Sequence, residues 1–251
     1  MNFDQLLNVS MRLGTMLLEN GAEIYRVEES IRRMVLAYGA KEVDVYAIPN
    51  TIIVTLMTQD NCNLTKTKRI HDRTTDLDKV ERLNHLCRQI CQNTPDLTTV
   101  DKQLNEISQR PVYGFYSHLI AYAVTSSMFT LFFGGNFSDA FWCFWIGPLL
   151  KITAHHLTKL RTNPFFTTIL CSFFCGLLSM LVCHFQLASH VDKMIIGLVM
   201  NLVPGVAITN SVRDIIAGDF IAGQTKMTEA LLTATSIAVG TGIALSISTY
   251  F

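Results

Sequence analysis

The sequence is poor in charged residues. Asp, Glu, Lys and Arg make up 16% of its 251 residues, whereas soluble domains carry about 25%. Hydrophobic residues account for 49% of the chain, and the mean hydropathy is positive. This scarcity of charge argues against an ordinary cytosolic enzyme.

Several other features are missing. Basic and acidic residues balance at 20 each, so the basic excess that nucleic-acid binding needs is absent. The seven cysteines contain no CxxC pair, which favours reduced thiols and indicates no metal site. We find no nucleophile elbow, no ordered Ser/His/Asp set and no phosphate-binding glycine loop. The sequence therefore predicts neither an enzyme nor a cofactor.

The charge that is present is unevenly distributed. Residues 1–110 hold 29 of the 40 charged side chains, and residues 111–251 hold 11. The opening MNFDQLLNVSMRLG is not a signal peptide, because it has no basic segment followed by an apolar core. We predict a small α+β cytoplasmic domain over 1–110, followed by a transmembrane domain over 111–251.

Hydrophobic spacing gives the order of elements in the first half. Apolar residues recur every three or four positions in two segments, then alternate in three short runs, then return to helical spacing twice. The order is ααβββαα, over residues 3–20, 24–38, 43–47, 51–55, 64–70, 76–93 and 96–109.

The second half predicts five transmembrane helices, since a helix needs about 20 apolar residues to cross a bilayer. The predicted spans are about 113–134, 138–157, 165–187, 194–212 and 229–250. Basic residues flank the spans on one side (Lys159, Arg161, Arg213 and Lys226), and only Lys193 lies on the other. The positive-inside rule then predicts a cytoplasmic N-terminus and an external C-terminus.

Two spans carry small residues at intervals of four, which we interpret as helix-packing faces rather than thiolate metal sites. They are Cys171, Cys175, Ser179 and Cys183 in the third span, and Ala230, Ala234, Ala238, Gly242 and Ser246 in the fifth.

Polar residues are densest in the fourth span, MNLVPGVAITNSVRDIIAGD. Pro204 removes a helical hydrogen bond and Gly205 adds flexibility, and interrupted helices expose backbone groups to solutes in secondary transporters. We predict a transport path through Asn201, Pro204, Gly205, Thr209, Asn210, Arg213 and Asp214. The alternative is a tolerated kink with polar groups that hold helices together.

Arg213 and Asp214 are adjacent, so on a helix they point about 100° apart and need other partners. Arg213 can attract a carboxylate-bearing solute, and Asp214 can carry a proton. The alternative for both is a charge that only fixes topology.

Five segments follow one another along essentially the whole chain: NGAEIYRVEESIRRMVLAYG (20–39), AIPNTIIVTL, His71-Asp72-Arg73, LVPGVAITNSVRDIIAGD (202–219) and the small-residue-rich last span. Together and in this order, they resemble the threonine/serine exporter family. By this resemblance Gly21, Glu23, Arg26 and Glu28 match the first cytoplasmic motif, and Pro204, Gly205, Asn210 and Asp214 match the membrane motif. Composition alone makes the His71 triplet a polar turn.

The resemblance implies an inner-membrane exporter of threonine, serine or a related small carboxylate. An odd number of spans implies the larger subunit of a split, two-component form, paired with a smaller membrane subunit; a homo-oligomer is the alternative assembly. The absence of a nucleotide-binding loop favours proton coupling, with Asp214, Asp219, Glu229 and His118 as candidate coupling groups. The alternative function is a metabolite-sensing or assembly subunit without transport activity.

Overall fold

The computed structural model describes residues 2–111, 113–160 and 162–248. The chain divides into two compact units. The first comprises Met1–Arg110 and Ile208–Met227, and the second comprises Pro111–Ala207 and Thr228–Phe251. A stretch that the sequence places in the membrane half, 208–227, thus belongs to the same unit as the N-terminal elements.

The first unit contains two helices, a three-stranded antiparallel sheet and two more helices, as predicted. Their bounds are α1 Phe3–Glu19, α2 Ile24–Ala37, β1 Glu42–Ile48, β2 Thr51–Met57, β3 Asn63–Arg69, α3 Leu77–Asn93 and α4 Leu97–Ser108. The strands lie in the order β1-β2-β3. Ile48 pairs with Thr51, so Pro49 and Asn50 form a two-residue turn between β1 and β2.

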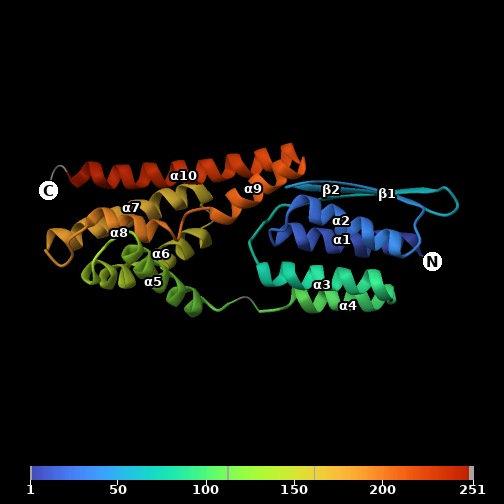
Figure 1. Cartoon of the computed structure of the whole chain (residues 1–251), viewed down its shortest axis with the longest axis horizontal. Coiled ribbons are helices and arrows are strands. Elements are labelled where there is room, and N and C mark those ends of the chain that lie inside the picture. Colours follow the sequence, from blue (N-terminus) through green and yellow to red (C-terminus); the bar gives the residue numbers. More distant parts are fainter. Residues whose placement is uncertain (1, 112, 161, 249–251) are drawn as a thin grey trace. The chain divides into compact units, whose positions relative to one another are not determined.

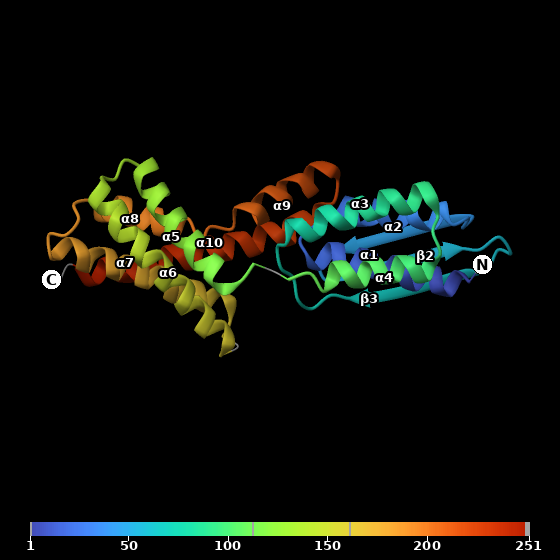
Figure 2. The ribbon, with the colours of Figure 1, turned by 90° about the horizontal axis from the view of Figure 1, so that it is seen from below.

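These elements stack in layers. Helices α1 and α2 lie between the sheet on one side and the α3–α4 pair on the other (Figure 1 and Figure 2). Only one face of the sheet is covered, which explains why alternate residues of β2 are buried: Ile52, Val54 and Leu56.

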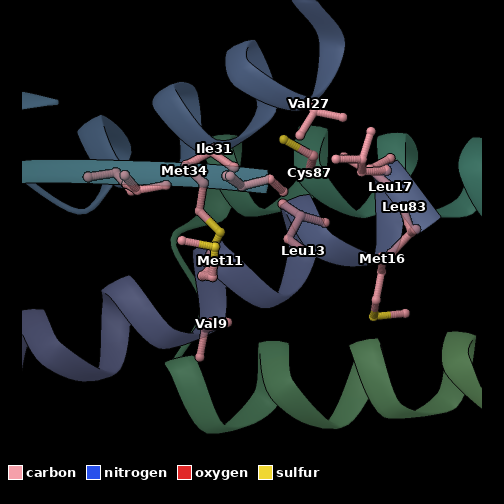
Figure 3. Packing of buried hydrophobic residues seen from close by; sticks show 14 of the residues in the cluster. Val9, Met11, Leu13, Met16, Leu17, Val27, Ile31, Met34, Leu83 and Cys87 are labelled. Carbon is pink, nitrogen blue, oxygen red and sulfur yellow. The ribbon is translucent and has the colours of Figure 1, made fainter. Parts of the chain in front are cut away.

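The middle layer has two apolar faces because α1 is apolar on most of its circumference. Its buried side chains meet those of α2 and α3 in one core, where Leu13 and Ile31 are fully buried and Cys87 lies beside them (Figure 3). Burying each such aliphatic side chain contributes about 1.5–3 kcal/mol. This core holds the start of α2 in place, and the residues discussed below surround that start.

The second unit is helical. Its elements are α5 Phe115–Phe132, α6 Phe137–Lys159, α7 Pro164–His184, α8 Val191–Val199, the start of α9 (Gly205–Ala217) and most of α10 (Phe220–Ser248). Within the described residues, two helices are long and apolar enough to cross a membrane, over Pro164–His184 and Phe220–Ile247. Five membrane-spanning helices are not confirmed.

The fourth predicted span, 194–212, is not one continuous helix. Helix α8 ends at Val199, residues 200–204 are not α-helical, and α9 begins at Gly205. The interruption coincides with Pro204, whose ring and missing N–H remove a helical hydrogen bond and disfavour a continuous helix at this point. With 9 and 13 residues, each piece is too short to cross a bilayer alone.

Glycines allow helices of the second unit to approach closely. A Cβ on Gly147 of α6 would lie 2.6 Å from the Tyr122 carbonyl oxygen of α5, and one on Gly197 of α8 would lie 2.1 Å from Thr130 Oγ1. No side chain fits at either position without movement. The packing of α5 against α6 and α8 therefore depends on these two glycines.

The predicted small-residue faces have different outcomes. In α7, Cys171, Cys175 and Ser179 are buried as predicted. In α10 only Ala230 of the predicted stripe is buried, and Ala234, Ala238, Gly242 and Ser246 are exposed within the chain. The face that packs lies two positions further along, and a Cβ on its Gly240 would lie 2.2 Å from the Ile169 carbonyl oxygen.

Candidate functional site

The end of α9 and the start of α10 form a tight turn that belongs to the first unit. Gly218 has φ +99°, and Gly223 lies so close to α9 that a Cβ would be 2.8 Å from the Ser211 carbonyl oxygen. Asp219 N donates to the Asp214 carbonyl oxygen at 2.9 Å, which closes the turn. A rigid turn of this kind fixes the side chains that precede it.

Asp214 is completely buried and fully engaged. Its Oδ1 accepts a hydrogen bond from the Ile24 amide at 3.2 Å, and its Oδ2 accepts one from Lys226 Nζ at 2.7 Å. Ile24 is the first residue of α2, where amides lack helical partners and the helix dipole favours an anion. The carboxylate thus caps α2 and neutralises a nearly buried lysine.

Two more contacts join α9 to the turn between α1 and α2. The Arg213 guanidinium pairs with the Glu23 carboxylate, which also pairs with Arg26 at 3.1 Å. Asn210 Nδ2 donates to the Gly21 carbonyl oxygen at 3.1 Å. Arg213 and Asp214 therefore do not pair with each other, as their spacing on a helix predicts, and both find partners on or beside α2.

Glu28 lies one turn further along α2 and accepts a hydrogen bond from the Ala47 amide of β1 at 2.7 Å. Burial raises the pKa of Glu28, the hydrogen bond from the Ala47 amide lowers it, and the charge of Asp219 raises it. Burial likewise raises the pKa of Asp219, with the Asp214 carboxylate acting in the same direction and Lys226 opposing it. Two carboxyl groups with raised pKa values therefore flank the Asp214 network.

Gly21 has φ +91°, a conformation that suits glycine, and an added Cβ would lie 3.1 Å from the Thr74 carbonyl oxygen. The loop after β3 is tied to the same turn, because Thr74 N donates to the Glu19 carbonyl oxygen at 2.8 Å. His71, Asp72 and Arg73 occupy this loop with exposed side chains. These three residues form a polar loop, as composition alone indicates.

Three of the remaining predicted residues, Asn201, Pro204 and Gly205, lie at the helix interruption in the second unit. Asn201 Nδ2 donates to Ser126 Oγ at 2.7 Å and also reaches the Leu198 carbonyl oxygen at 3.3 Å. Pro204 is partly buried and Gly205 is exposed. Thr209, on α9, is exposed and belongs to the first unit. The structure thus divides the predicted transport residues between the two units.

Several residues that form buried polar contacts in the structure are not among the site residues predicted from the sequence. Lys226, treated only as a topology signal, pairs with Asp214 in the first unit. In the second unit the buried Asp139 accepts hydrogen bonds from the Ser189 amide at 2.7 Å and from His190 Nδ1 at 2.8 Å. They could have been predicted from the scarcity of charge, because each acidic residue in a charge-poor segment needs a partner.

The described residues contain no cluster of three or more His, Cys, Asp or Glu side chains that could hold a metal ion. The network around Asp214 instead consists of fixed charges, a helix N-terminus and two carboxyl groups of raised pKa. Such an arrangement can hold or exchange a proton and can bind or release an anion at Arg213. Beside this α+β unit, the described residues contain two helices that are long and apolar enough to cross a membrane, Pro164–His184 and Phe220–Ile247.

The sequence matches the model of the threonine/serine exporter family, ThrE, over residues 8–248. The chain therefore belongs to this family, which places it in a membrane. It is 22% identical over 250 residues to the "Threonine/serine exporter" of Corynebacterium glutamicum, covering 97% of this chain and 51% of that protein. The chain thus spans about half the length of that relative.

A second relative is nearly the same length as this chain. The "Probable succinate transporter subunit YjjP" of Escherichia coli K12 is 24% identical over 238 residues, which cover 94% of this chain and 92% of that protein. The protein of the same name from Klebsiella aerogenes is 23% identical over 232 residues, 92% of this chain and 89% of that protein. No solved structure matches the chain. These relatives bear the names of transporters, not of enzymes.

Proposed function

We propose that the chain is a subunit of a secondary exporter of small hydrophilic metabolites, either threonine and serine or a related small carboxylate. The observation that carries this proposal is the interruption between α8 and α9 at residues 200–204. A backbone that leaves the helix within a membrane segment offers carbonyl and amide groups to a polar solute. Pro204 leaves the Met200 carbonyl without its helical amide partner.

We propose two separate contacts for the solute, one with Asn201 in the second unit and one with Arg213 in the first. Asn201 lies in the interruption itself, where its amide can exchange Ser126 for a solute hydroxyl. Arg213, whose side chain is 49% exposed, holds the Glu23 carboxylate. A solute carboxylate would take the place of Glu23, so Glu23 acts as an internal competitor for the same guanidinium.

Proton coupling would involve the carboxyl groups beside Asp214. Asp219 and Glu28 are candidates because their raised pKa values favour the protonated form more than in water. A change in their charge acts on the Asp214–Lys226 pair, and Asp214 is next to Arg213 on α9. Protonation and solute binding would thus act on the same short stretch of α9.

The proposed orientation places the N-terminus in the cytoplasm and the C-terminus outside. Arg213 and Lys226, which follow the positive-inside rule, pair with residues of the first unit, and that unit contains both Met1–Arg110 and Ile208–Met227. The N-terminal elements and the turn between α9 and α10 would therefore share one side of the membrane.

The proposed partner is a smaller membrane subunit of the same family. The relatives of similar length bear the name of a transporter subunit, and the exporter of Corynebacterium glutamicum is about twice as long. Helix α10 also has an exposed face of small residues, Ala234, Ala238 and Gly242, on which another helix can pack closely. A homo-oligomer is the alternative assembly.

Efflux of preloaded labelled threonine, serine and succinate tests the proposal, in cells that express this chain with and without a candidate small subunit. We expect efflux of one solute class only with both chains, and its loss when the proton gradient is collapsed. Undiminished efflux without the small subunit would favour the homo-oligomer. Failure to export any of the three solutes, with both proteins present in the membrane, would contradict the proposal.

A further inference from the structure

A polar cavity of about 520 Å³ lies between α2 and α3 in the first unit. Helix α2 contributes Arg26, Glu29 and Arg33 to its lining, and α3 contributes Asn84, Arg88 and Gln92. Its volume lies within the range of about 300–1,000 Å³ that is typical of small-molecule sites. None of the proposed transport residues lines it.

The lining carries an excess of positive charge. Three guanidinium groups line the cavity: Arg33 pairs with Glu29 at 2.5 Å, and Arg26 pairs with Glu23, which lies outside the lining. Arg26 stacks on the neighbouring Tyr25 ring, with its guanidinium carbon 5.7 Å from the ring centroid. Among the residues that the structure describes, no carboxylate lies within ion-pair distance of Arg88. The cavity therefore has unneutralised charge available for a ligand.

Nothing else in the lining opposes an anion. Burial, together with the neighbouring Cys91, raises the pKa of the Cys87 thiol to about 12, so the thiol is neutral at physiological pH. Its Sγ donates to the Ser30 carbonyl oxygen at 3.5 Å and is directed to the helix backbone. The side-chain amides of Asn84 and Gln92 supply uncharged donors and acceptors beside the arginines.

We propose that this cavity binds a small organic anion with at least two negative charges. Arginine forks bind carboxylate and phosphate groups through paired hydrogen bonds, and arginines on two facing helices can hold two such groups at once. Arg26 also pairs with Glu23, the partner of Arg213. A bound anion competes with Glu23 for Arg26, which makes the cavity a regulatory site for α9.

Isothermal titration of the purified full chain in detergent tests this site, with succinate, citrate and inorganic phosphate as probes and zwitterionic threonine as comparison. We expect saturable binding of at least one of the three anions, and at least tenfold weaker binding by Arg88→Gln. Arg88→Lys should restore part of the affinity. The matched control is Arg32→Gln, an exposed arginine of α2 outside the cavity, which should bind as the wild type does.

Two results would overturn the proposal: no saturable binding of any of the three anions, or equal affinity in Arg88→Gln and the wild type when both have the same melting temperature. The variant Arg213→Gln separates this site from the proposed transport site, because it should keep the binding that Arg88→Gln loses. Anion binding that requires Arg213 and not Arg88 would assign the ligand to α9 instead. The site does not rest on the export proposal, so failure of the efflux experiment leaves it intact.

Discussion

The carboxylate of Asp214 caps the N-terminus of α2 by accepting a hydrogen bond from the Ile24 amide at 3.2 Å, although 190 residues separate the two in sequence. The other carboxylate oxygen holds Lys226. One buried side chain thus satisfies a helix end and a cation at the same time. This relationship makes the start of α2 and the turn between α9 and α10 a single structural element.

Replacing Lys226 by Met should strongly destabilise the first unit. The substitution leaves Asp214 buried with an uncompensated charge, and breaking a buried pair on one side costs about 3–5 kcal/mol. Thermal unfolding of the purified chain measures the effect. The double variant Asp214→Asn/Lys226→Met, which removes both charges, should recover much of the loss.

The control for this experiment is Arg82→Gln, which breaks the exposed Asp78–Arg82 pair of α3. Exposed pairs contribute about 0–1 kcal/mol, so this variant should melt close to the wild type. Equal melting temperatures for Lys226→Met and Arg82→Gln would show that the Asp214–Lys226 pair is not buried as described.

Gly21→Ala should destabilise the chain more than Gly39→Ala. Both glycines have positive φ, +91° and +85°, so alanine pays a similar backbone cost of about 1–2 kcal/mol at each. Only at Gly21 does the new Cβ also approach another segment, at 3.1 Å from the Thr74 carbonyl oxygen. The difference in melting temperature between the two variants measures that contact, and a difference of zero would contradict it.

The raised pKa values of Glu28 and Asp219 predict a pH dependence of stability. A carboxyl group with a raised folded-state pKa binds its proton more tightly when folded, so it stabilises the fold below its unfolded-state pKa. That stability is lost as pH rises through the folded-state pKa. Asp219→Asn and Glu28→Gln should therefore lose less stability than the wild type between about pH 4, near the unfolded-state values, and neutral pH.

Thermal melts across this pH window check the prediction, with Glu42→Gln, an exposed glutamate of β1, as the control. The glutamine at position 28 can still accept the Ala47 amide, so its effect reports charge rather than a lost acceptor. If both variants follow the wild-type profile, neither carboxyl group has the proton affinity that its burial implies.

Glu23→Gln should strengthen the apparent affinity for a carboxylate solute. The substitution releases Arg213 from its internal partner, and loss of a partly exposed ion pair of about 1 kcal/mol corresponds to a roughly fivefold lower KM. Arg213→Gln should raise KM instead. Concentration-dependent efflux measures both, and a KM that is unchanged in both variants would exclude Arg213 from solute binding.

Gly242→Leu should weaken assembly with the partner subunit while leaving the chain itself folded. No atom lies within 4 Å of a Cβ at Gly242, whereas one at Gly240 would lie 2.1 Å from Ser172 Oγ. Gly240→Leu should therefore unfold or misfold the chain, and Gly242→Leu should only reduce co-purification of the partner. Unchanged co-purification by Gly242→Leu would show that the partner binds elsewhere.

Local pattern was sufficient for much of the first unit. The helices and strands from Phe3 to Ser108 follow from the switch between helical and alternating spacing, and Pro204 predicts the helix interruption. These features depend on residues close together in sequence, which is the range over which periodicity and backbone stereochemistry act.

The partners of the site residues could not be predicted in the same way. That Asp214 meets Ile24, or that Arg213 meets Glu23, depends on how α9 packs on α2, and a hydrophobic pattern does not specify this contact. The face of α10 that packs within the chain was not predicted for a related reason, because small residues occur on more than one side of that helix. Spacing shows which residues share a face but not which face is covered.

The cap on α2 also has a consequence for biosynthesis, because its two partners are synthesised at different times. The amide of Ile24 leaves the ribosome long before the carboxylate that caps it, because Asp214 follows 190 residues later. At about 5–20 residues per second, the delay is roughly 10–40 s. During translation, the first amide of α2 therefore lacks its Asp214 acceptor until the segment around α9 has been synthesised.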